Sequence, residues 1–596
     1  MTGSPEQDAP TKAAALADSI ALDWIGLQHG SGSFPDSIVE RCGPRGRDTY
    51  GEAMLGSALL AAGGRRFDEI VSRSGLRAVE FAIRTRRGFA PKRLPAPVAR
   101  LLPALKGGLY PFSMVGILDF LANGEVSSAQ PAEIRNGVER VARHEIRRAG
   151  PLDTRLIDRR RDTNRMVLEL LVLKSLESVR QLDVVRSEAP IAGQGTVDPL
   201  IETWCGEALR ESEGGRRSMA LISDRPDQPN AYHAFTAGNL ARMIRYFEPD
   251  RRADLEELLR RAVRMSRALS TPDGDLAWAG RTTMLGWTLS YTAYAALAAA
   301  NTPECDSGEA AESRGFAALL LDRLRDCYLP GASDTSHDRL CLVPALQESP
   351  DAAATALDPY AAEISYSGTT LLGLEWAAGE RGGEQTAPTD LVQPLPTETP
   401  LRALATVRTD QLWFGVRGQV STQRAEPRYD LGPVAASQRT NAGWQWLLHP
   451  RPRAVLPEHR SWLQLIDRGR PVPPRGHSFK RSGSTIEQEV IFTRASDESS
   501  CSGLRLVTEP SSDCNGMRIE LEGFKRPLQV IFWLPDASIE HEGSLVRAGE
   551  VELACTARPS VSQGEVVAGS TCAHLAALRL VFQPSSAQVS IDLRLV

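Results

Sequence analysis

A polar Asn-Ala-Tyr-His cluster occupies residues 230–233, within the stretch QPNAYHAFTAGNLARM of residues 228–243. Pro229 disfavours a helix and Asn230 is a good helix cap, so the sequence predicts a helix that begins directly after the cap. His233 then lies in the first turn, on the stripe that faces inward. Because an imidazole titrates near neutral pH, this position suits a general base or acid. The alternative is structural, since a histidine on an apolar face usually has its hydrogen bonds satisfied in the core.

A second candidate stretch is PDGDLAWAGRTTMLGWTLSYTAYAAL at residues 272–297. PDGD is typical of a turn, and a helix is predicted to follow it. The side chains that can react or bind a ligand are Trp278, Arg281, Trp287, Tyr291 and Tyr294. The last three are spaced i, i+4 and i+7, so they share one helix face, for which core packing is the alternative explanation. Buried phenols need hydrogen-bond partners, and an indole ring can stack on the apolar face of a sugar.

These candidates lie in a region with helical periodicity that extends to about residue 380. Apolar residues recur at helical spacing in segments rich in Ala and Leu, with Gly, Pro and Asp between them. The clearest segments are residues 49–63, 165–179, 241–269 and 286–300. The pattern predicts about ten to twelve helices at intervals typical of helix pairs. It contains no repeat motif of the tetratricopeptide or ankyrin kind.

The pattern changes after about residue 400. Short segments rich in Val, Ile, Phe and Thr alternate apolar and polar residues, for example TIEQEVIFTR and AQVSIDLRLV, as expected of antiparallel strands. A segment rich in Pro, Gly and Thr separates the two patterns. The chain is therefore predicted to be multidomain, α then β, with helix hairpins over 1–380, a linker over 381–400 and an antiparallel β-sandwich over 401–596.

This order resembles the polysaccharide lyases that have an (α/α) toroid followed by a β-sandwich, as in the heparinase II/III-like and alginate lyase families. The resemblance covers most of the chain as an architecture and rests, at the level of motifs, on the two stretches quoted above. It implies that the helix hairpins form an (α/α) toroid, with both stretches near one mouth. It also implies a carbon–oxygen lyase that cleaves a uronate-containing poly- or oligosaccharide by β-elimination.

The resemblance also implies roles for individual residues. In these families an Asn neutralises the uronate carboxylate, a His or Tyr removes the proton at C5, and a Tyr protonates the leaving oxygen. Carried over to this chain, His233 is the base or charge neutraliser, and Tyr291 is the acid or both acid and base. Asn230 and Arg281 would stabilise the developing negative charge. The families often have the Asn and His adjacent, whereas two residues separate Asn230 from His233 here, so the match at Asn230 is incomplete.

The predicted substrate-binding residues are Tyr232, Trp278, Trp287, Tyr294, Tyr366 and Asn164. Tyr366 lies in ISYSGTTLLGLEWAAG, a predicted helix start that would lie near the same mouth of a toroid; an ordinary helix start with core leucines is the alternative. Asn164 lies at the end of an Arg-rich run at 143–165 and is a second candidate for the carboxylate-neutralising amide. Aspartates interleave that run, which favours a salt-bridged, solvated face over a site for an anionic polymer.

Other functions stay open at this point. A glycoside hydrolase on the same scaffold needs two carboxylates across a cleft, for which the candidates are Asp224, Asp273, Asp275 and Glu363. A non-catalytic toroid that binds glycan or protein would keep its function without His233 and Tyr291. A lyase-like scaffold reused in a biosynthetic pathway is a further possibility.

Composition narrows the classes of partner. With 596 residues, 42% of them hydrophobic, and a formal net charge of −5, the chain does not favour nucleic acid or a membrane as its partner. The first thirty residues do not resemble a signal peptide and no membrane-spanning run occurs, so a cytoplasmic protein is expected unless a leader has been removed. Nine Cys without CxxC spacing indicate reduced thiols.

No cofactor or metal is predicted. His449, His459 and His477 are spread out and lack the spacing of metal ligands. The sequence contains no Gly-rich phosphate loop, nucleophile elbow or HExxH motif. The expected partner is an acidic poly- or oligosaccharide substrate.

Overall fold

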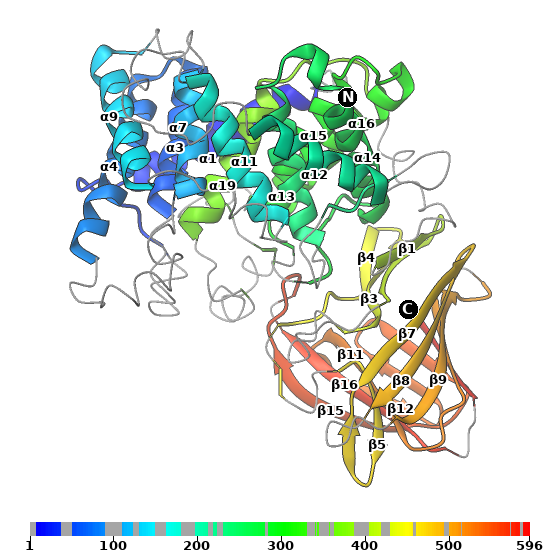
Figure 1. Ribbon diagram of the computed structural model, residues 1–596. Coiled ribbons are helices and arrows are strands. Elements are labelled where there is room, and N and C mark those ends of the chain that lie inside the picture. The colour runs from blue at the N-terminus through cyan, green and yellow to red at the C-terminus, as the bar shows by residue number, and fades with distance from the viewer. Residues whose placement is uncertain are drawn as a thin grey trace, which may run out of the picture.

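The computed structural model describes residues 8–36, 51–89, 110–122, 130–149, 163–179, 197–211, 219–222, 230–280, 284–329, 340, 343–344, 357, 363–386, 404–418, 430–453, 455–456, 461–493, 500–513, 515–572, 574–584 and 588–596. Within these ranges all helices precede all strands, which confirms the predicted order of α before antiparallel β (Figure 1). None of the helices described is long and apolar enough to cross a membrane.

The helices alternate along the chain between an inner and an outer set. The inner helices are α3 (Gly51–Arg66), α7 (Tyr110–Ala122), α11 (Thr163–Val179), α13 (Asn230–Ile244), α15 (Trp287–Ala300) and α19 (Glu363–Ala378). The outer helices are α1 (Ala9–Leu27), α4 (Glu69–Phe89), α9 (Ala132–Ala149), α12 (Val197–Glu211), α14 (Ala253–Leu269) and α16 (Ser307–Tyr328), with the short 3₁₀ helix η1 (Pro249–Arg251) before α14. Each inner helix packs against the next, and α19 packs against α3, so the inner set closes into a ring. Every outer helix packs against an inner one.

The inner helices run parallel to one another. A Cβ atom added at Gly51 would lie 2.9 Å from the Cβ of Ile364, and one at Gly368 would lie 2.5 Å from the backbone nitrogen of Leu55. The first turn of α3 therefore packs against the first turn of α19, and the next turn against the next, so the two helices point in the same direction. One outer helix separates each inner helix from the next, so the same direction recurs around the ring. The first turns of the inner helices open at one end of the ring, which we call the N-terminal mouth.

Small residues allow the inner helices to approach closely around Tyr291. A Cβ atom at Gly238 of α13 would lie 2.6 Å from the Cδ1 atom of Tyr291, and one at Gly373 of α19 would lie 2.7 Å from the Oγ atom of Ser290. Because a side chain at either glycine would push the helices apart, these positions fix how tightly α13 and α19 hold α15.

The β half contains three antiparallel sheets. The four-stranded sheet has the order β1 (Leu404–Arg408), β2 (Leu412–Arg417), β3 (Gly432–Thr440), β4 (Gly443–Leu448). The eight-stranded sheet has the order β12 (Ile539–Glu542), β13 (Leu545–Ala548), β14 (Val551–Cys555), β17 (Gln588–Leu595), β10 (Met517–Glu522), β9 (Ser500–Pro510), β8 (Thr485–Thr493), β7 (Pro474–Ser482). The five-stranded sheet has the order β15 (Ser560–Val567), β16 (Leu575–Phe582), β11 (Leu528–Pro535), β5 (Leu463–Asp467), β6 (Arg470–Val472).

The eight-stranded and five-stranded sheets share one hydrophobic core. Alternating side chains of β10, such as Met517, Ile519 and Leu521, are fully buried and lie in the same apolar cluster as Val530 and Phe532 of β11. Period-2 alternation therefore directs one face of each sheet inward, as the sequence pattern predicted for these strands.

The two halves meet through the four-stranded sheet, which lies nearest the helices in Figure 1. The hydroxyl of Thr406 on β1 donates a 2.6 Å hydrogen bond to the carbonyl of Ala268, near the end of α14. Trp278, in the loop before α15, packs edge-to-face against Trp413 of β2 with ring centroids 5.6 Å apart. Since outer helices end where inner helices begin, these contacts place the β half beside the N-terminal mouth.

Candidate functional site

Aromatic side chains from three inner helices converge inside the N-terminal mouth. We call this set the aromatic cluster; it comprises Phe235, Trp287, Tyr291, Tyr294 and Tyr366. Tyr291 stacks on Phe235 at 5.5 Å between ring centroids with an interplanar angle of 12°. Trp287 packs edge-on against Tyr291 at 6.1 Å and lies 6.3 Å from Tyr366. The predicted helix face of α15 is thus brought together with α13 and α19.

Trp287 and Tyr366 are the members nearest the mouth, since each lies in the first turn of its helix. Trp287 is only 3% exposed, yet its Nε1–H has no hydrogen-bond acceptor among the residues that the structure describes. Tyr366 is half-buried. A buried, unpartnered indole N–H carries a desolvation cost of roughly 1–3 kcal/mol, which a ligand or water acceptor would remove.

The two phenols deeper in the cluster are held protonated. Burial raises the pKa of Tyr291, and the nearby charge of Asp119 raises it further. Burial raises the pKa of Tyr294 to about 12, against the opposing charges of Arg245 and Arg242. No described residue forms a hydrogen bond with the Tyr294 hydroxyl. A neutral phenol suits proton donation, whereas a base would need a lowered pKa.

Below the aromatic cluster lies a charged network that we call the Asp119 network, comprising Asp119, Arg242, Tyr246 and Trp376. The Asp119 carboxyl accepts hydrogen bonds from Arg242 Nε at 3.0 Å, from Trp376 Nε1 at 2.6 Å and from the Tyr246 hydroxyl. Burial alone would lower the pKa of Arg242, but the charge of Asp119 raises it well above its ordinary value. The Trp376 ring packs against Tyr291 at 5.5 Å, so it joins the network to the aromatic cluster.

His233 lies on the opposite side of α13 from the ring axis. Its Nδ1 accepts a 3.0 Å hydrogen bond from the backbone N–H of Ile222, and its Nε2 is 3.0 Å from the carbonyl of Ala262 on the outer helix α14. These contacts define a neutral ring with its proton on Nε2, and burial lowers the pKa of His233 to about 4. Both ring nitrogens are therefore engaged by backbone, and His233 is not brought together with Tyr291. The base role of His233 stays a prediction without support from this geometry.

Trp278 is directed at the β half. Its Nε1 donates a 2.6 Å hydrogen bond to the carbonyl of Leu269, and the ring is 1% exposed. A Cβ atom at Gly415 of β2 would lie 2.7 Å from this indole, so the glycine makes room for it. In this conformation the ring packs between the halves and presents no face to a sugar.

The remaining predicted residues are placed less completely. Asn230 begins α13, but its side chain is outside the described set, and Arg281 lies outside the described residues. Tyr232 and Asn164 are half-buried in the first turns of α13 and α11. Their helix positions open at the N-terminal mouth, as those of Trp287 and Tyr366 do.

Of the carboxylates considered for a hydrolase, Asp273 and Asp275 both bind one arginine. Arg323 lies 3.0 Å from Asp273 and also pairs with Asp275, which is fully buried. This pair belongs to the loop before α15 and to the outer helix α16, not to two walls of a cleft. Glu363 is buried at the start of α19, and Asp224 lies outside the described residues.

The histidines considered as metal ligands do not form a described site. His449 is buried, its Nδ1 lies 2.8 Å from the Thr571 hydroxyl, and burial lowers its pKa to about 4. His459 and the side chain of His477 lie outside the described part of the chain. Among the residues that the structure describes, no group of three or more His, Cys, Asp or Glu side chains is placed to hold a metal ion.

Sequence reasoning missed Asp119, Arg242 and Trp376, although their types carried a signal. Asp119 interrupts the apolar run YPFSMVGILDFLA of α7, and a carboxyl group inside such a run needs buried partners. Phe235 was also missed as a ring that stacks on Tyr291. Asp36 is a further omission: it is 8% exposed and accepts a 3.3 Å hydrogen bond from the backbone N–H of Ile364 at the start of α19.

No protein-family model matches the chain, and no curated protein matches it. Solved structures that match include a variant of the chondroitin AC lyase of Streptomyces coelicolor A3, which is 11% identical with a TM-score of 0.33 over 97% of this chain and 82% of that one. An α-1,6-mannanase of Salegentibacter sp. is 10% identical, with a TM-score of 0.35 over 61% of this chain and 99% of that one. The unsaturated glucuronyl hydrolase of Bacillus sp. GL1 is 16% identical, with a TM-score of 0.34 over 62% of this chain and 94% of that one. Similarity this low does not assign a fold family or a reaction.

Proposed function

We propose that this chain is a glycan-active enzyme on an (α/α) toroid, and that it cleaves a uronate-containing poly- or oligosaccharide by β-elimination. One observation carries the proposal: aromatic side chains converge where the inner helices begin, at the end of the ring beside the β half. Trp287 and Tyr366 lie in the first turns of their helices and pack against each other, and the Trp287 indole N–H has no acceptor among the described residues. Aromatic rings with a few polar groups are the usual lining of a sugar site.

The proposed reaction removes the proton at C5 of the uronate and expels the oxygen at C4. The C5–H electrons form the C4–C5 double bond, the C4–O bond breaks, and the leaving oxygen takes a proton. We assign that proton to Tyr291, because its raised pKa keeps the phenol neutral until the oxygen becomes basic. We assign to Trp287 a hydrogen bond to the substrate through its indole N–H, and substrate contact to the half-buried Tyr366. We also propose Tyr366 as the base, a role that requires a nearby cation, proposed as Arg281, to lower the pKa of its phenol.

The uronate carboxylate must be neutralised before the C5 proton becomes acidic enough to remove. We propose Arg281 and Asn230 for this role, as the lyase resemblance implies, and Asn164 as a further amide. We propose a structural role for His233, which holds residues 219–222 and α14 against α13 through its two backbone contacts. The heparinase II/III-like and alginate lyase types are the proposed subclasses.

The experiment is incubation of the full chain with alginate, heparosan and chondroitin oligosaccharides while ultraviolet absorbance and reducing ends are both followed. β-Elimination releases both signals together, because the new double bond is conjugated with the carboxylate. Reducing ends without new absorbance would replace the lyase by a hydrolase. If no uronate substrate gave either signal, the proposal would be wrong.

The test variant is Tyr291→Phe, for which Tyr328→Phe is the matched control. Tyr328 is another fully buried phenol, but it lies on the outer helix α16 and donates a 3.0 Å hydrogen bond to the carbonyl of Met284. Its variant should lower stability without lowering the rate at which the double bond forms, whereas Tyr291→Phe should lower that rate about a hundredfold.

A further inference from the structure

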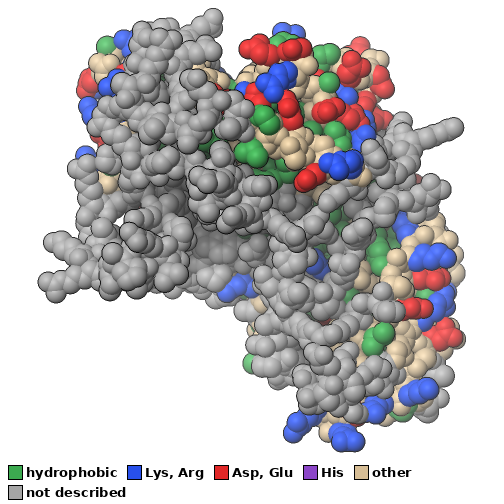
Figure 2. Space-filling model, in the orientation of Figure 1, with side chains coloured by type: hydrophobic (Ala, Val, Ile, Leu, Met, Phe, Trp, Pro, Cys, Tyr) green, Lys and Arg blue, Asp and Glu red, His purple; other side chains and the backbone are tan. Residues whose placement is uncertain are grey.

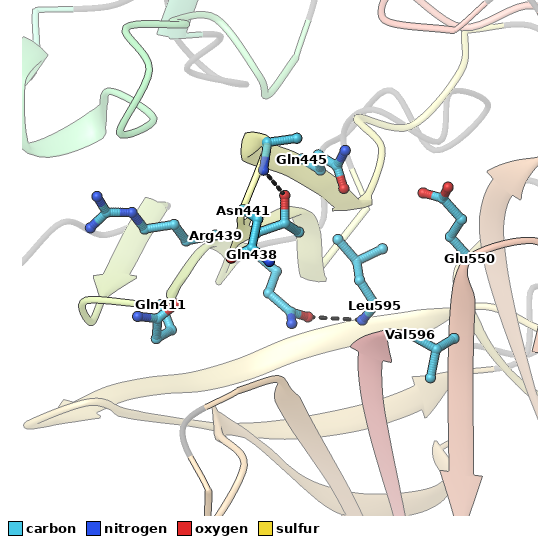
Figure 3. A pocket seen from close by; sticks show the side chains of 10 residues that line it. Gln411, Gln438, Arg439, Asn441, Gln445, Glu550, Leu595 and Val596 are labelled. Carbon is cyan, nitrogen blue, oxygen red and sulfur yellow. Dashed lines mark hydrogen bonds between the residues drawn. The ribbon is translucent and has the colours of Figure 1, made fainter.

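A polar groove lies in the β half, apart from the aromatic cluster. It has a volume of roughly 700 Å³ and is lined by Gln411, Gln438, Arg439, Thr440, Asn441, Ala442, Gln445, Glu550, Leu595 and Val596. We call it the amide groove, because four of these residues carry side-chain carboxamides. Figure 3 shows Gln438, Gln445 and Glu550 arranged around the end of β17 at Leu595 and Val596.

Strands β3, β4 and β17 form the groove, and hydrogen bonds join its walls. Gln438 of β3 and Gln445 of β4 are directly opposed in the antiparallel register, so their side chains lie on the same face of the sheet. The Oε1 atom of Gln438 accepts a 2.8 Å hydrogen bond from the backbone N–H of Leu595, and the N–H of Val596 donates at 2.9 Å to the carbonyl of Glu550. The Gln438 side chain and one backbone hydrogen bond therefore hold the walls of the groove to one another.

Most of the polar side chains that line the groove form no hydrogen bond or ion pair with another described residue. The side chains of Gln411, Asn441 and Gln445 are exposed, and no hydrogen bond to any of these amides occurs in the part of the chain that is described. The Glu550 carboxylate and the Arg439 guanidinium likewise make no ion pair with another described residue. Amides that both donate and accept hydrogen bonds match the hydroxyl groups of a sugar. Arg439 is opposed to Trp444 in the register, and Figure 3 shows its side chain extending away from Gln445 and Glu550, so Glu550 is the charged side chain that faces the amides.

The opposite face of β4 is already occupied. Trp444 and Trp446 flank Gln445 and point to the other side of the sheet, where Trp446 lies 6.5 Å from Trp413. Arg408 lies 5.9 Å over the Trp444 ring. One strand thus presents aromatic rings to the junction with the helices and an amide to the groove.

We infer that the amide groove binds a neutral, hydroxyl-rich saccharide segment, at a site separate from the proposed reaction. A volume of about 700 Å³ is within the range of roughly 300–1,000 Å³ in which small ligands bind. The Glu550 carboxylate would repel the carboxylate of a uronate, so an uncharged ligand matches the groove better. Because no aromatic ring lines the groove, affinity comes from hydrogen bonds and is weak, roughly millimolar.

The experiment is calorimetric titration of the full chain with cellotriose, maltotriose and mannotriose, and with an alginate trisaccharide for comparison. A neutral trisaccharide is expected to bind, and the double variant Asn441→Ala, Gln445→Ala is expected to weaken that binding about tenfold. Both residues are exposed and make no described hydrogen bond, so the variant retains its fold. Gln588→Ala, an exposed amide at the other end of β17, is the matched control and leaves binding unchanged.

Tyr291→Phe separates this inference from the proposed function. Binding at the amide groove does not depend on the phenol, so it persists in that variant even where double-bond formation is lost. The inference is overturned if no neutral trisaccharide binds, or if the double variant binds as the parent does. It is also overturned if sedimentation shows a dimer that the double variant abolishes, because the groove would then be an interface between copies of the chain.

Discussion

The aromatic cluster and the Asp119 network touch each other through Trp376 but satisfy their polar atoms differently. Within the network, the Asp119 carboxyl accepts from three donors, and each donor is a buried or partly buried side chain. Within the cluster, the Trp287 Nε1–H and the Tyr294 hydroxyl have no hydrogen-bond partner in the described part of the chain. Asp119 and Trp376 of the network and Trp287 and Tyr294 of the cluster are all at most 5% exposed, so burial alone does not explain the difference.

The difference indicates which region is structural and which binds a ligand. A fully paired buried network stabilises one arrangement of helices, since breaking any bond leaves a charge or dipole uncompensated. Unpaired donors that persist in a well-packed site are expected where a ligand or ordered water supplies the acceptor. The surface offers no comparable contrast: on the face shown in Figure 2, acidic and basic side chains are interspersed over the described parts of both halves.

Asp119→Ala is expected to have the largest effect. The change removes the acceptor of three hydrogen bonds and leaves the buried Arg242 charge without its partner, which costs about 3–5 kcal/mol of unfolding free energy. Chemical denaturation of the purified chain measures it. Asp326→Ala is the control, since Asp326 is exposed and pairs with exposed Arg325, and its cost should stay below about 1 kcal/mol. Equal costs for the two variants would contradict a structural role of the network.

His233 tests whether position at the mouth is enough to make a residue functional. Its folded pKa of about 4 lies below the ordinary unfolded value, so the neutral ring contributes stability above about pH 6.5 that is lost as the pH falls towards 4. The loss attributable to this ring is about 3 kcal/mol. His233→Gln keeps a donor and an acceptor without a titration, so its stability should fall less steeply over that range.

The same variant distinguishes the two roles of His233. If His233 is structural, His233→Gln should retain most of its lyase activity at pH 7. If His233 is the catalytic base, the variant should lose activity about a hundredfold or more. His449→Gln controls for the pH effect alone, because burial lowers the pKa of His449 to about 4 as well. If His233→Gln lost most of its activity while its unfolding free energy stayed unchanged, His233 would take part in the reaction and its role would not be structural.

Tyr291→Phe is expected to lower the rate of double-bond formation about a hundredfold, or roughly 2.7 kcal/mol. Its ring contacts with Phe235 and Trp376 remain, so the unfolding free energy should change by less than about 1 kcal/mol. Activity and denaturation are measured on the same preparation. A loss of stability in proportion to the loss of rate would assign Tyr291 to the structural region instead.

Local periodicity predicted which helix faces are buried but not what they are buried against. It put Trp287, Tyr291 and Tyr294 on one face, and the structure brings Trp287 and Tyr291 into contact. It put His233 on an inward stripe as well. An inner helix of a ring is buried on two sides, towards the axis and towards its outer partner, and a period of 3.6 does not distinguish them. His233 faces the outer partner, α14.

Contacts between distant segments lay beyond any pattern in the sequence. Its place after the PDGD turn led to the prediction that Trp278 binds substrate, but its partner Trp413 belongs to the β half. Asp119 and Trp376 meet only because α7 and α19 both contribute to one ring. Long-range pairs of this kind depend on the closure of the ring, which no single stretch of residues encodes.

Trp287→Phe should have the smallest effect on stability and so gives the sharpest test of the unpaired donor. The variant loses an indole N–H for which the described ranges supply no acceptor, whereas Trp278→Phe loses one that donates at 2.6 Å to the carbonyl of Leu269. Trp287→Phe should therefore cost about 1 kcal/mol less in unfolding free energy than Trp278→Phe. It should nevertheless raise KM for a uronate oligosaccharide several-fold, about 1 kcal/mol in binding, while Trp278→Phe leaves KM unchanged. If Trp287→Phe destabilised the chain more than Trp278→Phe and left KM unchanged, the unpaired N–H would mark a packing defect and not the site of a ligand.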